Sequence, residues 1–529
     1  MYEIDKIIYA KGVTPMQVAI VAKEEPFFSA EKKFKEILVG LSRGEMMCKE
    51  HSEIELYLKT EGFELLRRMM QAHLELRCQQ EQRTEVIDAN VITMTRVRQT
   101  QRALETIFGK VIVERKGYSK KDKASLHPLD GELNLASELY SHGVREIVAK
   151  QAAKESFSEV VKTLTSTTGA SIAKRQAEEL AQRAAVDFEA FYQQPCNQNQ
   201  AEIEQTSAVL VITSDGKGVV MHNQDLREAT RKAALAHIPK KENRLSRAEN
   251  RNSKRMATVA SVYTIAPYIR TAQEIVGQMH PIHQKEKQRP KPEQKRVWAS
   301  VEKDAEEVIG TAFAEAISRD PEKTKKWVAV VDGNEKQLEV LEAFAIKYGV
   351  VLTIILDLIH VLEYLWKASY VFNEKESKEA EIWVNERLLE ILLGNSSDVA
   401  VGISHSAILQ ELDPKQREGA DKCVNYLLKY ASYLHYDQYL AQGLPIASGV
   451  IEGACRYLVK DRMDLTGARW RLLGAEAVLK LRSLCASGDF DDYWHFHLHK
   501  ELLRNHKSKY AYGSLPLQPL PPSPLHLVK

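Results

Sequence analysis

The sequence has few cysteines and no closely spaced pair of them. Six cysteines are scattered over 529 residues, and none forms a Cys-x-x-Cys pair. A disulfide framework and a zinc ribbon are therefore not expected, and this cysteine usage fits a reducing cytoplasm. Cys48 with His51, and the histidines of 495–499, could recruit a metal, but neither group has a matching second half. Solvated or packed side chains are the simpler interpretation of both.

The sequence also lacks a long uninterrupted apolar stretch. The longest apolar run begins at Val350 and is broken by Asp357, His360 and Glu363, which would be costly in lipid. The opening residues, MYEIDKIIYAKG, do not combine a basic start with an apolar stretch, so no secretory signal is expected. Together these absences predict a cytoplasmic protein without a membrane span.

Net charge is nearly absent, but positive charge is concentrated locally. The whole chain has a formal charge of +2. Residues 231–255 contain nine Lys or Arg against two Glu, and residues 284–296 contain six against two. Such blocks attract phosphate backbones, which makes Lys254 and Arg255 candidate DNA contacts. A solvated loop is the alternative for either block.

Periodicity and composition divide the chain into several expected domains. A chain of 529 residues with 44% hydrophobic and 28% charged residues is expected to be globular and multidomain. Residues 26–83 have helical spacing, and residues 109–119 alternate as a strand does. The expected parts are an N-terminal helical region at 1–90, a small linker or β segment at 91–142, a helix-turn-helix domain at 143–200, an α/β catalytic domain at 205–505 and a Pro-rich extended tail at 506–529.

Residues 156–184 predict two helices around a turn at Gly169. A serine can cap each helix, either Ser156 or Ser158 for the first and Ser171 for the second. This order matches a helix-turn-helix whose second helix enters a DNA major groove, although many helical hairpins share it. The residues that the second helix would present to DNA are Lys174, Arg175 and Gln176.

From residue 205 the pattern changes to alternating strands and helices. The expected order is three strands, a helix, a strand, a helix and a strand, with the first two strands joined in a hairpin at Asp215-Gly216. This order predicts an RNase H-like mixed sheet with helices packed on it. An all-helical insertion is expected at about 361–445, ahead of a last core helix that carries Glu452.

Three acidic residues stand where metal-dependent phosphoryl transfer would need them. Asp215 and Asp332 each lie where an apolar strand is expected to end, and Glu452 lies near the start of a helix. Two-metal catalysis needs hard oxygen ligands on rigid elements, with two Mg²⁺ ions about 3.5–4 Å apart. Singly, each aspartate is more simply a turn residue, and Glu452 a solvated helix residue. Together, in this order and beside basic blocks, they favour catalysis.

Several segments resemble blocks of one protein family. VITSDGKGVVM, WVAVVDGNEKQ, LDLIHVLEYLW and GVIEGACRYLVKDRMDLTGARW are similar to blocks of bacterial insertion-sequence DDE transposases of the ISKra type, which are related to the Mutator-like transposases. The resemblance covers residues 104–494, because the segments LETIFGKVIVERKGYS and SFSEVVKTLTSTTG upstream also look like that family. It implies that Asp215, Asp332 and Glu452 form the DDE triad and that the helical insertion separates the last strand from the helix of Glu452.

The same resemblance implies a function. A transposase of this type would bind the terminal inverted repeats of its element in double-stranded DNA, cleave a strand with two Mg²⁺ ions, for which Mn²⁺ can substitute, and transfer it to target DNA. Synapsis of two ends implies a homo-oligomer on the bacterial nucleoid. Two alternatives stay open, namely a transposase-derived regulator that binds DNA without catalysis, and another RNase H-like nuclease.

The resemblance also points to accessory residues. Asp357 and His360 match the Cys-or-Asp, two residues, His signature of Mutator-like transposases, and their spacing puts both on one face of a helical turn. We expect them to hold the insertion against the core. Metal ligation by Asp357 in place of Asp332 is the alternative.

Three further residues are candidate DNA contacts near Glu452. Arg456 and Lys460 follow Glu452 at four and eight residues, so on one helix face they could neutralise phosphates of the scissile strand. A pair between Glu452 and Arg456 within the helix is the alternative. Trp470 could stack on a distorted terminal base, or it could be buried in the core.

Overall fold

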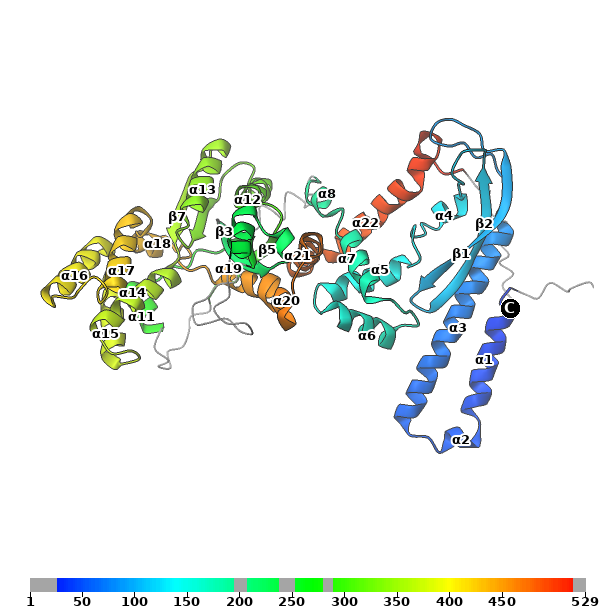
Figure 1. The fold of residues 1–529 in the computed structure, drawn as a ribbon, viewed down its shortest axis with the longest axis horizontal. Coiled ribbons are helices and arrows are strands. Elements are labelled where there is room, and N and C mark those ends of the chain that lie inside the picture. Colours follow the sequence, from blue (N-terminus) through cyan, green and yellow to red (C-terminus); the bar gives the residue numbers. More distant parts are fainter. Residues whose placement is uncertain (1–25, 195–206, 237–252, 279–288, 517–529) are drawn as a thin grey trace, which may run out of the picture. The chain divides into compact units, whose positions relative to one another are not determined.

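The computed structural model describes residues 26–194, 207–236, 253–278 and 289–516 (Figure 1). The chain forms two compact units. Unit 1 comprises Met1–Ser141, Thr168–Ala170 and Asn505–Lys529, and unit 2 comprises His142–Thr167 and Ser171–Arg504. Most of the predicted helix-turn-helix region therefore belongs to the same unit as the α/β core. Within the described ranges, every helix is too short or too polar to cross a membrane.

Unit 1 is a long helical hairpin with a two-stranded sheet packed on it. The strands β1 and β2 pair antiparallel along their full length, and β2 packs on α3 through Leu74, Val111 and Val113. The helical pattern predicted at 26–83 and the strand at 109–119 are confirmed, and β1 is a partner strand that the pattern did not reveal. The elements are α1 (Phe28–Leu41), α2 (Gly44–Met47), α3 (His51–Gln80), β1 (Arg96–Thr106), β2 (Gly109–Ser119) and α4 (Pro128–Glu132).

Unit 2 begins with a group of short helices, α5 (His142–Ala152), α6 (Phe157–Thr167), α7 (Lys174–Ala184) and α8 (Phe188–Tyr192). Ser156 caps α6, because its hydroxyl accepts from the Glu159 N–H at 3.3 Å. The cap predicted for the next helix is wrong, since α7 begins at Lys174 with Ala173 as its N-cap. Gly169 belongs to unit 1, where it allows a close approach, because a Cβ there would lie 2.4 Å from the Phe108 carbonyl oxygen.

The core of unit 2 is a five-stranded mixed sheet in the order β5-β4-β3-β6-β7. The strands β5, β4 and β3 pair antiparallel, and β3, β6 and β7 pair parallel. Their bounds are β3 (Val209–Val220), β4 (Lys254–Ile265), β5 (Glu293–Ser300), β6 (Lys326–Val331) and β7 (Leu352–Leu356). The helix α12 (Ala305–Arg319) packs on β3 and β4 and against α13 (Glu335–Tyr348).

From β5 onward the predicted alternation of strand and helix is confirmed, but the short helices α10 (Glu228–Ala236) and α11 (Ala272–Gln278) separate the first three strands, and one predicted turn is wrong. The strand β3 does not turn at Asp215-Gly216, because it pairs with β4 from Val209 to Val220. The third strand is instead β5, which begins inside the basic block 284–296. An Asp-Gly pair is a strong local turn signal, yet here the antiparallel ladder with β4 keeps the chain extended through it.

Side chains close both edges of the sheet. Backbone N–H groups of β5 and of the residue after it donate to Glu476, Ser483 and Ser487 of α21 (Leu472–Ser487). At the other edge, the hydroxyls of Tyr436 and Tyr439 donate to carbonyls of β7. An open sheet edge is a template for pairing with another chain, so these contacts confine the sheet to five strands.

The predicted all-helical insertion is confirmed between β7 and the helix of Glu452. It consists of α14 (Leu358–Phe372), α15 (Lys378–Leu392), α16 (Ser396–Leu409), α17 (Glu418–Lys429) and α18 (Tyr436–Ala441). The chain then returns through α19 (Gly449–Ala454), a π-helical segment (Cys455–Lys460) and α20 (Asp461–Met463). It ends in α21 and α22 (Phe490–Asn505), while most of the predicted tail lies outside the described residues.

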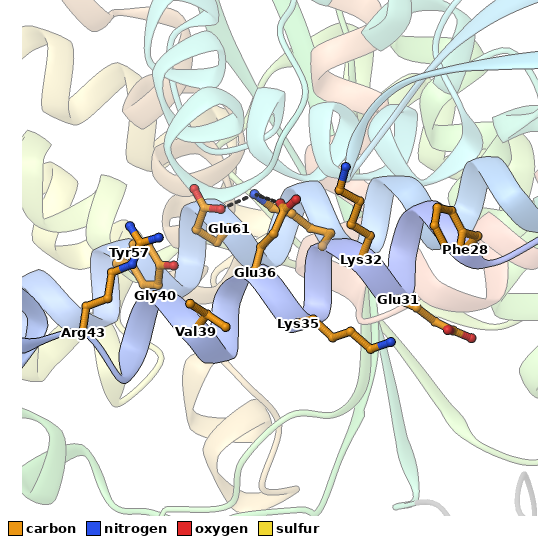
Figure 2. Close-up of a pocket in the computed structure, with 11 residues that line it drawn as sticks. Phe28, Glu31, Lys32, Lys35, Glu36, Val39, Gly40, Arg43, Tyr57 and Glu61 are labelled. Atoms are coloured by element: carbon orange, nitrogen blue, oxygen red, sulfur yellow. Dashed lines mark hydrogen bonds and ion pairs between the residues drawn. The ribbon is translucent and has the colours of Figure 1, made fainter.

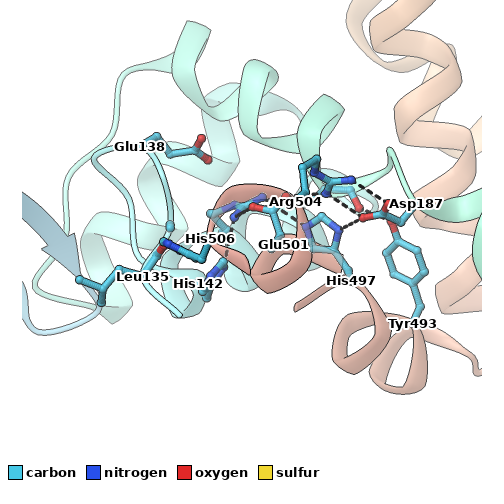
Figure 3. A network of polar contacts seen from close by, with 12 residues as sticks. Leu135, Glu138, His142, Asp187, Tyr493, His497, Glu501, Arg504 and His506 are labelled. Carbon is cyan, nitrogen blue, oxygen red and sulfur yellow. Dashed lines mark hydrogen bonds and ion pairs between the residues drawn. The ribbon is translucent and has the colours of Figure 1, made fainter. Parts of the chain in front are cut away.

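A buried polar network joins α22 to the short helices of unit 2 (Figure 3). The ring of His497 is completely buried; its Nδ1 lies 2.7 Å from the Asp187 carboxylate and its Nε2 lies 3.2 Å from the Arg145 guanidinium. Arg145 also donates to Glu501 at 2.6 Å, and Arg504 donates to Asp187 and Glu501. Two guanidinium groups thus face two carboxylates, which satisfies the charges that burial would otherwise penalise.

Candidate active site

The register of the parallel strands aligns three aspartates at the end of the sheet where β6 and β7 finish. Thr213 of β3 lies opposite Val330 of β6, and Val331 of β6 lies opposite Leu356 of β7. Continued by one or two residues, the same register brings Asp215, Asp332 and Asp357 to one level. Neighbouring strands lie about 4.8 Å apart, so the two predicted triad aspartates are neighbours although 117 residues separate them in sequence.

Asp215 lies within a strand rather than at its end. The strand β3 continues past it, and the side chain is half-buried. One carboxylate oxygen accepts from the Gly216 N–H at 2.5 Å, and the other accepts from the Cys455 thiol at 3.2 Å. Burial, followed by the charge of Asp215, raises the pKa of Cys455 well above its ordinary value, so this thiol remains a donor to Asp215.

Asp332 follows the last residue of β6 and shapes the turn after it. Its carboxylate accepts from the Asn334 N–H at 3.0 Å, while Gly333 takes a φ of +90° that favours glycine. Its carbonyl oxygen accepts from the Tyr426 hydroxyl of the insertion at 3.2 Å. Asp332 therefore acts as a turn residue, and it is also one of the three aligned aspartates, Asp215, Asp332 and Asp357, which we call the row of aspartates.

The carboxylate of Asp357 holds the first turns of two helices together. It is completely buried, and it caps α14 by accepting from the Ile359 N–H at 3.1 Å. It also accepts from the Ser448 N–H at 3.1 Å and from the Ser448 hydroxyl. Because Ser448 is the N-cap residue of α19, this carboxylate fixes the start of the insertion to the start of the helix that carries Glu452.

Glu452 lies in the first turn of α19, which packs on β3 and β4. Partial burial, and then the negative charges of Asp357 and Asp215, raise the pKa of its carboxyl above the ordinary value, while His360 opposes them. The carboxylates of Asp215, Asp357 and Glu452 are thus close enough to influence one another electrostatically. His360 is a partly exposed member of it, with Nδ1 4.0 Å from Glu363.

The helix after Glu452 does not keep α-helical spacing. Cys455–Lys460 is π-helical, a form that is frequent at functional sites. Arg456 therefore pairs with Asp461, five residues on, at 3.7 Å, and its side chain is 78% exposed. Lys460 is also exposed. Cys455, which the sequence analysis did not select, contacts Asp215 because it follows Glu452 by three residues on the helix that crosses β3.

Carboxylates are the donors that Mg²⁺ prefers, and the aligned row and Glu452 supply four of them. In the described ranges, however, no three His, Cys, Asp or Glu side chains stand close enough together to hold one ion as they are placed. Asp215 is held instead by Cys455 and Gly216. The donors fit Mg²⁺ in chemistry, but the side chains of Asp215, Asp332 and Glu452 would have to turn toward one another to form a closed ligand set.

The predicted DNA contacts of α7 are exposed. Its first turn presents Lys174, Arg175 and Gln176 to solvent, and Arg175 pairs with Glu179 at 3.1 Å. The opposite face, with Ala177 and the other buried residues of α7, packs on α5, α6 and α21. The helix therefore turns a polar face outward.

Two candidate DNA contacts of unit 2, and one arginine of the basic block 284–296, make contacts within the protein. Trp470 is 6% exposed, and its indole N–H donates to the Met463 carbonyl at 3.0 Å, so the alternative of burial in the core is confirmed. The Arg255 guanidinium donates to the carbonyls of Val301, Asp225 and Glu302. Arg296 forms partly buried ion pairs with Glu315 and Asp489.

The remaining basic residues are only partly described. Lys254 is exposed at the start of β4. The larger part of the block 231–255 and the start of the block 284–296 lie outside the described residues.

Comparison with protein-family models and with curated proteins finds no match to this chain.

Proposed function

We propose that this chain is a bacterial insertion-sequence transposase of the DDE type with an RNase H-like catalytic core. The observation that carries the proposal is the register of β3 and β6, which, continued past its last pair, brings Asp215 level with Asp332, the residue after β6. Glu452 lies on a helix that packs on β3. The sheet order, with three antiparallel strands followed by two parallel ones, is the order expected of an RNase H-like core and supports the same proposal.

The proposed chemistry assigns a role to each group of residues. Asp215, Asp332 and Glu452 would hold two Mg²⁺ ions, or Mn²⁺ in their place, which would activate the attacking oxygen and stabilise the leaving one. Asp357 and Ser448 position the helix of Glu452. The exposed side chains of Arg456 and Lys460 would bind phosphates of the scissile strand.

The proposed substrate is double-stranded DNA that carries the ends of the element. The exposed first turn of α7, with Lys174, Arg175 and Gln176, would read the terminal repeats as the second helix of a helix-turn-helix. Lys254 would add a contact without sequence preference. The chain would work on the nucleoid in the bacterial cytoplasm, as a homo-oligomer that brings two ends together.

A second candidate function is a regulator that binds DNA without cutting it. It is favoured by the placement of the acidic side chains, because no three of the described ones are near enough to hold one ion and Asp215 is bound by a thiol. In that case the helix α7 would keep its role and the row of aspartates would be structural.

The experiment is Mg²⁺-dependent nicking of a duplex that contains inverted repeats found beside the gene. Asp215→Asn, Asp332→Asn and Glu452→Gln are each expected to lose nicking and keep end binding, because each removes a hard anionic oxygen. Any single change should do nearly as much damage as all three, since the residues act as a unit. Glu335→Gln, an exposed acid three residues after Asp332, is the matched control and should nick normally.

Two results would overturn the proposal. Nicking that survives all three substitutions would show that cleavage does not depend on Asp215, Asp332 and Glu452. End binding by the parental chain without nicking in either Mg²⁺ or Mn²⁺ would support the regulator.

A further inference from the structure

Three segments of the chain, residues 83–98, 118–126 and 507–512, meet at one end of the two-stranded sheet of unit 1. It is the end where β1 begins and β2 finishes. The last segment pairs with the first, because the Ala89 N–H donates to the Lys509 carbonyl at 2.9 Å. Charged side chains from all three segments are therefore gathered at this end. The buried core that the segments share consists of Val86, Met94, Tyr118, Leu126 and Tyr510.

The charge at this end of unit 1 is mainly positive. The three segments contain eight Lys or Arg against three Asp or Glu, whereas the whole chain has a formal charge of only +2. One of the three acids, Asp88, is buried and accepts from the backbone N–H groups of Asn90 and Ile92. The eight cationic side chains are exposed or half-exposed. We call them the basic end, and they are Arg83, Arg96, Arg98, Lys120, Lys121, Lys123, Lys507 and Lys509.

The cations of the basic end are little used within the protein. Lys123 lies 3.9 Å from the Asp88 carboxylate, and in the part of the chain that the structure describes the other seven form no ion pair. A neighbouring cation of β2 differs, because Arg115 is buried and pairs with Asp130 at 2.9 Å. Folding therefore uses Arg115 and leaves the basic end available to an external anion.

The helical hairpin of unit 1 does not share this positive excess. Residues 28–80 contain nine Lys or Arg and nine Glu, with no Asp. Figure 2 shows acids and bases interleaved along α1, among them Glu31, Lys32, Lys35 and Glu36. Positive charge is thus concentrated where the three segments meet, and such a cluster is typical of surfaces that bind phosphate backbones.

One aromatic ring is exposed beside these cations. Tyr512 follows Lys509 by three residues, is 92% exposed, and has a φ of +57°, in the left-handed region that favours glycine. The other two aromatic residues of the three segments, Tyr118 and Tyr510, are buried. Surfaces that hold single strands present several rings on which successive bases stack. Eight cations with one exposed ring therefore fit the backbone of a duplex better than the bases of a single strand.

We propose that the basic end binds the phosphate backbone of double-stranded DNA without sequence preference. Lysine and arginine side chains that neutralise phosphates release counterions, which supplies the affinity. This surface is separate from α7 and from the row of aspartates, since both of those belong to unit 2. It would add affinity to the reading of the element ends without adding specificity. The choice of DNA as the polyanion rests on the proposed function, whereas the site itself rests on charge and exposure.

The test measures binding of the full-length chain to a random-sequence duplex of about 30 base pairs by fluorescence anisotropy, between about 50 and 200 mM salt. The test variant combines Lys120→Gln, Lys121→Gln and Lys509→Gln. Its log-log slope of affinity against salt should be flatter by about 0.9 for each lost phosphate contact, and its affinity at about 100 mM salt should fall by about 10-fold or more.

The matched control combines Lys32→Gln, Lys35→Gln and Lys49→Gln. It removes the same charge from exposed positions of the same unit, but from the hairpin, where acids balance the bases. Its affinity and its salt slope should stay close to those of the parental chain. Circular dichroism of both variants verifies that the fold persists.

Three outcomes would overturn the inference. Equal weakening in the test and control variants would trace the effect to net charge. A test variant that binds the duplex as the parental chain does, while nicking still depends on Asp215, Asp332 and Glu452, would remove the basic end and leave the proposed function standing. A preference for single-stranded DNA that Tyr512→Ala abolishes would assign the surface to unpaired bases. Weakened binding by the test variant of a chain that never nicks would instead support the basic end and count against the proposed catalysis.

Discussion

Replacement of Asp357 by Ala separates a structural role from metal binding. The buried carboxylate accepts three hydrogen bonds, one from the Ile359 N–H in the first turn of α14 and two from Ser448. Loss of a helix cap costs about 1 kcal/mol, and leaving the buried hydroxyl and N–H of Ser448 without an acceptor costs about 1–3 kcal/mol more. The expected loss in the free energy of unfolding of unit 2 is therefore about 2–4 kcal/mol.

The assay is urea unfolding followed by tryptophan fluorescence. All six tryptophans lie between residues 298 and 494, inside unit 2, so the signal reports this unit. With a urea slope of roughly 3 kcal/mol per molar, the midpoint should fall by about 1 M. Ser448→Ala should lose less, and the double variant should lose less than the two single losses added together, because the residues share hydrogen bonds.

His360→Ala is the control from the same motif. The ring is partly exposed, and its nearest acid, Glu363, is 4.0 Å away, so the midpoint should move little. The reasoning about Asp357 would be refuted by an unchanged urea midpoint combined with a complete loss of Mg²⁺-dependent nicking. That combination would make Asp357 a metal ligand.

Two further predictions concern buried groups of unit 2. Trp470→Ala should lower the free energy of unfolding by about 3–5 kcal/mol, as loss of a buried large aromatic does, and a loss of DNA affinity at unchanged stability would restore the stacking role. Glu501 has a pKa of about 2, because Arg145 and Arg504 outweigh the effect of burial, which raises it. Since this folded value is below the unfolded value of about 4.3, its contribution is complete above pH 4.3 and is lost as the pH falls toward 2. Glu501→Gln should flatten the loss of stability between about pH 5 and 2 relative to the parental chain, and an unchanged slope would contradict the assignment.

Local sequence patterns predicted those helices and strands whose apolar residues recur with one clear period. The helices of 26–83, the all-helical insertion and the alternation of strand and helix from residue 305 to 356 follow directly from apolar spacing. The position of Asp332 at the end of a strand was also predictable, because a β-branched run before an Asp-Gly pair indicates a strand that ends in a turn. These features depend on neighbours within a few residues, which the sequence displays.

The sequence by itself therefore determined the helical N-terminal region, the helical insertion and the alternation of strand and helix from residue 305 to 356. It also indicated which acidic residues could lie at the carboxyl ends of the parallel strands. The tertiary structure alone decided that β3 runs straight through Asp215, that Trp470 is buried, and that Arg255 and Arg296 make contacts within the protein. It also decided that Cys455 meets Asp215 across 240 residues. The physical reason is that a strand register or a buried ion pair depends on partners remote in the sequence, and local propensity does not specify which partners meet.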